Sequence, residues 1–114
     1  MAADTVFHKI LRKEIPATFL HEDDVCVAFK DIHPQAPFHA LVVPKAFLDS
    51  LESAVPADAA VLGHCLVVAK RIADAAGCGK AFRVVTNSGA GAGQSVPYLH
   101  FHVLGGRPRS GLTG

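Results

Sequence analysis

Several residue types are scarce in this chain, and their scarcity excludes whole classes of protein. The 114 residues include no tryptophan, one tyrosine and three cysteines. The cysteines are odd in number, widely spaced and form no CxxC, which argues against a disulfide framework and against a thiolate zinc site. We therefore expect Cys26, Cys65 and Cys78 to be small buried hydrophobic residues.

Long apolar runs and export signals are also missing. Lys70, Arg71 and Asp74 interrupt the longest apolar segment, so it falls short of the roughly 20 residues that a membrane-spanning helix requires. The opening MAADTVFHKI has no basic start followed by a long apolar stretch, as a secretion signal would. We expect a cytoplasmic protein that does not bind membranes.

Charge is scarce as well. Charged residues make up 18% of the chain, and the net charge is +1, so no overall field attracts nucleic acid. Half of the residues are hydrophobic, enough for one buried core. We expect a single domain over residues 1–114, with its core at 5–106 and an extended or mobile tail at 107–114.

The hydrophobic pattern predicts an α+β fold with a five-stranded, largely antiparallel sheet and helices on one face. Thr5 is the expected N-cap of a short helix whose apolar stripe is Val6, Phe7, Ile10 and Leu11. The expected elements are a helix at 6–13, strands at 18–21, 25–29 and 39–44, a helical turn at 47–51, a long helix at 57–76, and strands at 82–87 and 99–104.

The long helix carries an apolar band that is wider than one sheet requires, so we expect part of it to face a second subunit. The band consists of Val61, Leu62, Cys65, Leu66, Val68, Ala69, Ile72 and Ala73.

The last strand is the main candidate for chemistry. Because side chains alternate along a strand, Leu99, Phe101 and Val103 should enter the core while His100 and His102 lie side by side on the other surface. The loop before it contains Gly89, Gly91 and Gly93, which let the backbone approach a ligand, and Gln94 and Ser95, which can form hydrogen bonds with one.

Three interpretations of this region remain open from the pattern alone. His39, His100 and His102 could bind zinc. The histidine pair could simply be the half-exposed polar face of a strand. A neutral imidazole could also attack phosphorus, and only this interpretation explains the hydrogen-bonding loop beside the pair. The other histidines, His8, His21, His33 and His64, are expected to be surface or structural residues.

Four segments carry a resemblance to a known family: FHKILRKEIPA, EDD at 22–24, AFKDIHPQAPFHALVVPK and GQSVPYLHFHVLGG. With these segments the chain resembles the histidine triad (HIT) superfamily, and within it the Hint branch of nucleoside phosphoramidases. The resemblance implies a five-stranded antiparallel sheet with one long helix, and a homodimer in which two sheets join. It also implies hydrolysis of a purine nucleoside 5'-monophosphate, AMP or GMP, linked to an amine leaving group, with no metal or other cofactor.

The resemblance also implies roles for individual residues. His100 would be the nucleophile that carries the nucleotidyl intermediate, flanked by His102 and His39. Asp31 would bind the ribose. The base pocket would consist of Phe7, Ile10, Phe29, Ile32 and Leu41, and the phosphate or leaving group would be bound by Asn87, Gly93 and Ser95.

One position departs from the pattern that the resemblance implies. The family motif is His-x-His-x-His, and Tyr98 stands where its first histidine is expected. In the family a backbone carbonyl at this position holds the nucleophile, and tyrosine supplies the same carbonyl, so we expect activity to survive. The alternative is a nucleotide-binding module whose catalysis is reduced or lost owing to Tyr98.

Overall fold

The structure is a computed structural model that describes residues 4–106; the predicted tail at 107–114 lies outside this range. Short 3₁₀ turns lie at Leu51–Ser53, Pro56–Asp58 and Ala90–Ala92. The helices and strands follow in the order α1 (Val6–Leu11), β1 (Phe19–Glu22), β2 (Cys26–Lys30), β3 (Phe38–Pro44), α2 (Ala59–Ala75), β4 (Phe82–Val85) and β5 (Phe101–Gly105).

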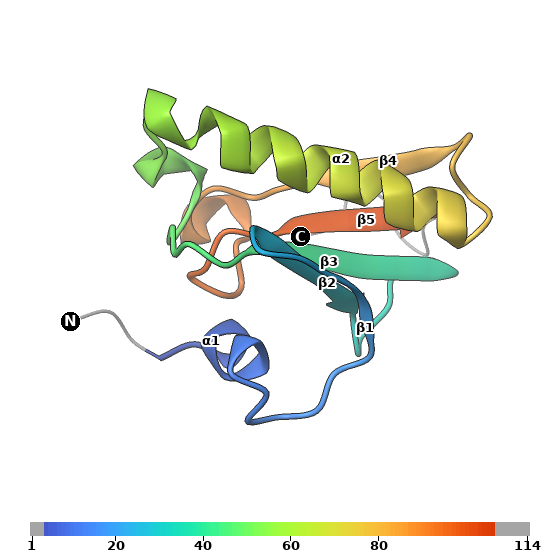
Figure 1. Ribbon diagram of the computed structural model, residues 1–114, viewed down its shortest axis with the longest axis horizontal. Helices are drawn as coiled ribbons and strands as arrows, with labels where there is room; N and C mark the ends of the chain where they lie inside the picture. The colour runs from blue at the N-terminus through green and yellow to red at the C-terminus, as the bar shows by residue number, and fades with distance from the viewer. Residues whose placement is uncertain (1–3, 107–114) are drawn as a thin grey trace.

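The five strands form one antiparallel sheet in the order β1-β2-β3-β5-β4 (Figure 1). This confirms the predicted fold class. Strand β3 is central, and its residues from His39 to Pro44 are buried, as its nearly continuous apolar sequence predicts. On its β5 side, Leu41 pairs with His102 and His39 with Leu104. The pairing brings two of the predicted catalytic histidines together from distant parts of the chain.

The two helices cover opposite faces of the sheet, so the prediction that they share one face is wrong (Figure 1). Helix α2 packs Cys65, Val68 and Ile72 against one face. Helix α1 packs Phe7 and Ile10 against the other. A sheet whose central strand is apolar on both faces needs a cover on each, and α2 alone supplies only one.

Helix α1 begins at a reciprocal cap between Thr5 and His8. The Thr5 hydroxyl accepts from the backbone N–H of His8 (3.2 Å), and His8 Nδ1 accepts from the backbone N–H of Thr5 (3.0 Å). The helix ends before the predicted residue because Lys13 adopts a positive φ of 62°. Val6, a member of the predicted apolar stripe, is 43% exposed.

Several element boundaries differ from prediction because local hydrogen bonds interrupt the regular pattern. Helix α2 begins at Ala59, since Pro56–Asp58 forms a 3₁₀ turn whose Asp58 carboxylate accepts from the Val55 N–H. Strand β5 begins at Phe101, because the Leu99 N–H donates to the Leu48 carbonyl rather than to a strand. Strand β4 ends at Val85, and the predicted turn at 47–51 is replaced by the 3₁₀ turn Leu51–Ser53.

Most of the predicted apolar band of α2 faces the sheet. Its member Leu66 is 49% exposed and the neighbouring Val67 is 55% exposed, whereas Cys65, Val68 and Ile72 are buried. Cys26 and Cys65 are fully buried as predicted, whereas Cys78 is only half-buried. Within residues 4–106, no helix has the length and apolar character to cross a membrane.

Candidate active site

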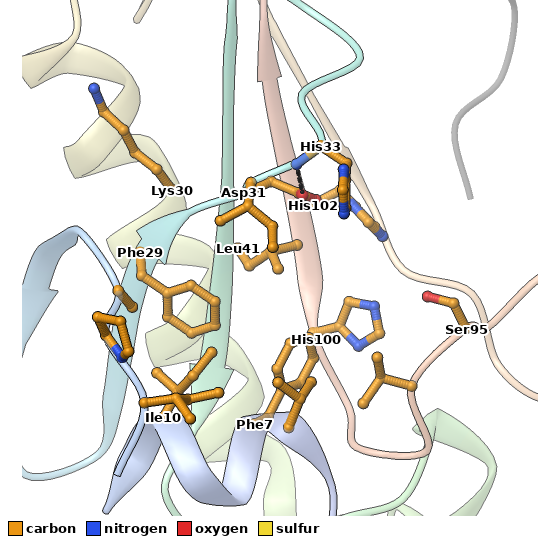
Figure 2. A pocket seen from close by; sticks show the side chains of 16 residues that line it. Phe7, Ile10, Phe29, Lys30, Asp31, His33, Leu41, Ser95, His100 and His102 are labelled. Carbon is orange, nitrogen blue, oxygen red and sulfur yellow. Dashed lines mark hydrogen bonds between the residues drawn. The ribbon is translucent and has the colours of Figure 1, made fainter. Parts of the chain in front are cut away.

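A cavity of about 250 Å³ lies between α1 and the sheet face that it covers (Figure 2). All five residues predicted for a base pocket line it, together with Asp31, Ser95, His100 and His102 from the other predictions. Four of the five apolar residues are buried, and Ile32 is 82% exposed at the rim. The cavity is therefore apolar on the α1 side and bears imidazoles on the β5 side. The five apolar residues are Phe7, Ile10, Phe29, Ile32 and Leu41.

His100 is held by the backbone two residues before it. Its Nδ1 lies 2.6 Å from the Tyr98 carbonyl oxygen, and because a carbonyl can only accept, Nδ1 carries the proton. In the neutral ring, Nε2 is then left with a free lone pair. The Phe7 ring lies edge-on to the imidazole, with 5.0 Å between ring centroids. The site thus presents one oriented, unprotonated nitrogen beside the cavity.

His102 and His39 form a hydrogen-bonded chain whose proton positions follow from its far end. The backbone N–H of Gln35 donates to His39 Nδ1 (3.0 Å), so His39 carries its proton on Nε2. His39 Nε2 lies 2.9 Å from His102 Nδ1 and donates to it. His102 must therefore carry its own proton on Nε2. This N–H is the second polar group at the site with a defined direction.

Burial keeps the three imidazoles neutral. His100 and His102 are 4% and 5% exposed, so the interpretation of the pair as a half-exposed strand surface is wrong. Desolvation lowers the pKa of His100, and this effect is larger than the opposite effect of the hydrogen bond to the Tyr98 carbonyl, which raises it. Desolvation, together with the two neighbouring histidines, lowers the pKa of His102 to about 4. Burial also lowers the pKa of His39. All three rings are neutral at pH 7.

Asp31 is fixed at the start of the loop that follows β2. Its Oδ1 accepts from the His33 N–H (2.8 Å), and its own N–H donates to the His39 carbonyl (3.0 Å). Its Oδ2 lies 3.3 Å from His39 Nε2. Asp31, His39 and His102 are spaced as a metal-ligand group would be, but His100 is not part of that group.

Two buried N–H groups have no acceptor among residues 4–106, namely His102 Nε2 and Asn87 Nδ2. A buried donor without a partner costs about 1–3 kcal/mol, which an anionic ligand could recover. Asn87 itself does not line the cavity, and neither does Gly93. The Gly93 N–H donates to the Ala90 carbonyl (3.0 Å) at the end of a 3₁₀ turn. Of the three predicted phosphate-binding residues, only Ser95 lines the cavity.

Tyr98 is itself a buried structural residue, with 1% of its surface exposed. Its hydroxyl donates to the Pro44 carbonyl at the end of β3 (2.7 Å). Its ring packs edge-on against His8 and Phe47, with centroid distances of 4.8 and 5.0 Å. These contacts pack the Tyr98 side chain against α1 and the residues that follow β3.

Comparison with known proteins identifies the family. The family model described as "HIT domain" matches residues 12–109. The chain belongs to the HIT family. An uncharacterized HIT-like protein of Synechocystis sp. is 56% identical over 114 residues, covering 100% of both chains. The structure of a HIT family hydrolase from Legionella pneumophila superposes with a TM-score of 0.89 at 40% identity, covering 96% of this chain and 98% of that one. A histidine triad nucleotide-binding protein from Candida albicans gives a TM-score of 0.83 at 30% identity, covering 96% of this chain and 80% of that one.

The HIT domain also brings residues to the cavity that sequence reasoning missed. His33, predicted to be a surface or structural residue, lines the cavity beside Asp31. The turn after α1 contributes Ile15, Pro16 and Ala17. No periodic pattern marks this turn, because its position depends on how α1 packs against the sheet. The two prolines at 34 and 37, which restrict the loop after Asp31, were the only local signal near His33.

Proposed function

We propose that this HIT protein is a hydrolase of the Hint type that cleaves the P–N bond of purine nucleoside 5'-phosphoramidates. The observation that carries the proposal is the hydrogen bond from His100 Nδ1 to the Tyr98 carbonyl. It leaves Nε2 unprotonated at the wall of a cavity large enough for part of a nucleotide. The hydrolase named among the structural neighbours supports the same reaction class.

In the proposed reaction, His100 Nε2 attacks the α-phosphorus. The Nε2–P bond forms as the P–N bond breaks, and the leaving nitrogen takes a proton from solvent water, so that the amine departs as a neutral molecule and His100 becomes a phosphorylated imidazolium. Water then attacks phosphorus and gives up a proton to solvent as the Nε2–P bond breaks, which releases the nucleoside monophosphate and returns His100 to its neutral state. The Nε2–H of His102 donates to a nonbridging phosphate oxygen, with its direction set by the bond from His39.

The rest of the cavity suits a nucleoside. The apolar wall formed by Phe7, Phe29 and Leu41 can contact a base, and the Asp31 carboxylate can accept from the ribose hydroxyls. Asn87 Nδ2 and the Ser95 hydroxyl are the proposed phosphate or leaving-group donors, together with the Gly93 amide once its turn adjusts. The nucleotide-binding protein from Candida albicans supports a nucleotide as the ligand.

The direct test uses a fluorogenic adenosine 5'-phosphoramidate with wild-type protein and His100→Ala. We expect His100→Ala to lower kcat at least 1,000-fold while AMP binding and the circular dichroism spectrum stay close to wild type. Mass spectrometry after rapid quenching should find AMP attached to wild-type protein but not to the variant. Unchanged turnover in His100→Ala would refute the proposal, and AMP binding without turnover in the wild type would favour the nucleotide-binding module.

A homodimer is the proposed assembly, in which the sheets of two subunits join. Leu66 and Val67 on the outer surface of α2 are half-exposed, and Val84 on the edge strand β4 is 37% exposed. Burying such residues against a second copy would explain the wide apolar band. Light scattering after size-exclusion chromatography should give about twice the 12.0 kDa chain mass, and a monomer would refute this proposal.

A further inference from the structure

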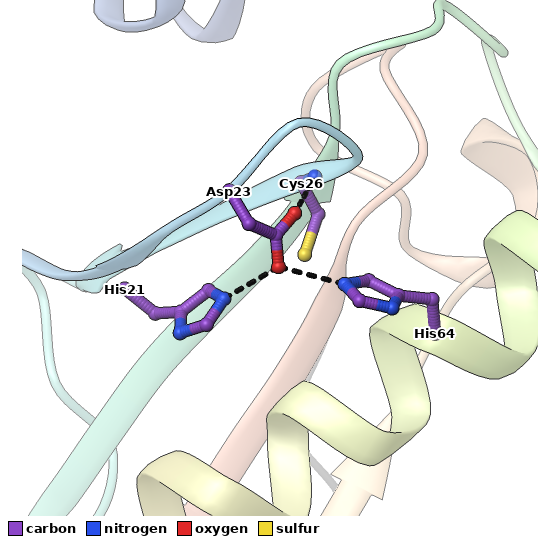
Figure 3. Close-up of side chains that lie close together, drawn as sticks. All are labelled: His21, Asp23, Cys26 and His64. Carbon is purple, nitrogen blue, oxygen red and sulfur yellow. Dashed lines mark hydrogen bonds and ion pairs between the residues drawn. The ribbon is translucent and has the colours of Figure 1, made fainter.

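A second cluster of polar side chains lies away from the cavity, between the β1–β2 turn and α2 (Figure 3). It consists of His21 on β1, Asp23 in the turn, Cys26 at the start of β2 and His64 on α2. One possible ligand atom from each lies within 4.8 Å of those of the others. We propose that these four residues bind one zinc ion, and that this ion ties α2 to the β1–β2 hairpin.

The Asp23 carboxylate is already oriented as a metal ligand would be. Its Oδ1 accepts from the backbone N–H groups of Val25 (2.7 Å) and Cys26 (2.9 Å). Its Oδ2 lies 2.6 Å from His21 Nε2 and 2.7 Å from His64 Nε2. The backbone bonds fix one oxygen, so the other faces both histidines. Hydrogen bonds that orient a ligand in this way are typical of metal sites.

The donor set suits zinc better than a hard cation. It combines two imidazole nitrogens, one sulfur and one carboxylate oxygen, and zinc binds all three donor types in tetrahedral geometry. Magnesium and calcium prefer sets made only of oxygen. With Cys26 as a thiolate and Asp23 ionised, two negative charges balance the charge of the ion. A neutral ensemble of this kind is compatible with a site whose cysteine is fully buried.

Zinc binds cysteine as the thiolate, so binding at this site releases one proton from Cys26.

Small movements of the two imidazoles would bring them to zinc-binding distances. Nitrogen and oxygen ligands about 2.0–2.1 Å from a tetrahedral zinc lie about 3.3 Å apart, so His21 Nε2 must move about 0.7 Å and His64 Nε2 about 0.6 Å away from Asp23 Oδ2. Both imidazoles are partly exposed, His21 at 17% and His64 at 36% of the side chain, which leaves room for this movement. Each ring then carries its remaining proton on Nδ1.

The site is closed and lies apart from the proposed chemistry. Cys26 belongs to the core cluster on the α2 side of the sheet, whereas His100 and His102 face the α1 side. Four protein ligands leave no open position for a substrate, which is typical of structural zinc. The expected consequence is a more stable fold, and the hydrolase reaction needs no metal at this position.

The test is a cobalt(II) titration of the full-length, tag-free protein after treatment with a chelator. We expect tetrahedral d–d bands and a thiolate-to-cobalt charge-transfer band at one equivalent, both removed by zinc. His64→Ala should weaken cobalt affinity at least tenfold, and Cys26→Ser should abolish the charge-transfer band. Since Cys26 is buried and its variant could fail to fold, His64→Ala, with a partly exposed side chain, is the decisive variant.

Two control variants separate this site from its rivals. Cys78→Ser tests the half-buried cysteine outside the cluster, and His102→Ala tests the Asp31–His39–His102 group, which contains no cysteine. Both should keep the charge-transfer band. The inference is overturned if wild-type protein gives no such band, if His64→Ala binds cobalt as tightly as wild type, or if Cys78→Ser loses the band. His64→Ala should also hydrolyse the phosphoramidate at the wild-type rate, so the two proposals fail independently.

Discussion

Replacing Tyr98 tests whether this position serves catalysis through its backbone or through its side chain. In the structure the backbone carbonyl of Tyr98 holds His100, while the phenol hydroxyl bonds to the Pro44 carbonyl. Tyr98→Phe removes the hydroxyl and keeps the carbonyl. Tyr98→His restores the residue type that the family resemblance implies. The two substitutions should therefore change stability, and neither should change the orientation of His100.

The expected magnitudes follow from the contacts of the side chain. Tyr98→Phe leaves the buried Pro44 carbonyl without its hydroxyl donor, which costs about 1–3 kcal/mol. Tyr98→His also gives up part of the ring contact with Phe7, His8 and Phe47, so we expect it to cost about 2–4 kcal/mol. We expect kcat to stay within about threefold of wild type in both variants, because both keep the backbone carbonyl that orients His100. A change of 1 kcal/mol in the activation barrier would alter kcat by more than threefold.

The assay combines urea unfolding with turnover of the fluorogenic phosphoramidate. Tyr98 is the only tyrosine and the chain has no tryptophan, so intrinsic fluorescence would report on the mutated residue itself. Unfolding must therefore be followed by circular dichroism. A gain of tenfold or more in kcat for Tyr98→His would refute the reasoning, because it would show that the side chain limits catalysis. So would a 100-fold loss in Tyr98→Phe with unchanged stability.

Three further predictions concern the cavity. His102 has a folded-state pKa of about 4 against about 6.5 unfolded, so the unfolded chain binds more protons below pH 6.5. The contribution of His102 to the free energy of unfolding should fall by about 3 kcal/mol between pH 6.5 and 4, measured in urea titrations as the difference between wild type and His102→Gln. Thr5→Ala removes the cap of α1 and should cost about 1 kcal/mol in the same titrations, with a raised KM because Phe7 lies on that helix. Asp31→Asn should raise KM about tenfold for the ribose substrate but not for its 2',3'-dideoxy analogue, and an equal change for both would contradict the ribose role.

The parts of the fold that could be predicted depend on signals close together in the chain. The Thr5 cap, the apolar run of β3 and the alternation of His100 and His102 are each contained within a few residues, and all three are confirmed. The position of α1 could not be derived in this way. Its six residues carry only a short apolar stripe. The face of the sheet that α1 covers is the one that α2 leaves uncovered, and the sequence of α1 does not specify it.

The other features that could not be predicted from the sequence depend on contacts between residues far apart in the chain. His64 meets Asp23 across 41 positions of sequence, and no local pattern marks either residue as a partner of the other. The burial of the histidine pair also escaped prediction, because Phe7 of α1 packs against His100 and His39 of β3 packs against His102. A histidine in an ordinary segment therefore gives no indication of its environment until the helix or turn that covers it is placed.

His100, which immediately precedes β5, and His102 within β5 differ in the same respect, and this difference bears on the role of Tyr98. His100 is oriented by a carbonyl two residues away, so its geometry survives any side chain that keeps the local backbone in place. His102 is oriented by His39, which reaches it only because β3 and β5 pair in one register, with Leu41 opposite His102. Changes that disturb the β3–β5 pairing should therefore impair phosphate contact by His102 before they affect the nucleophile. A change confined to the Tyr98 side chain should leave the orientation of both histidines intact.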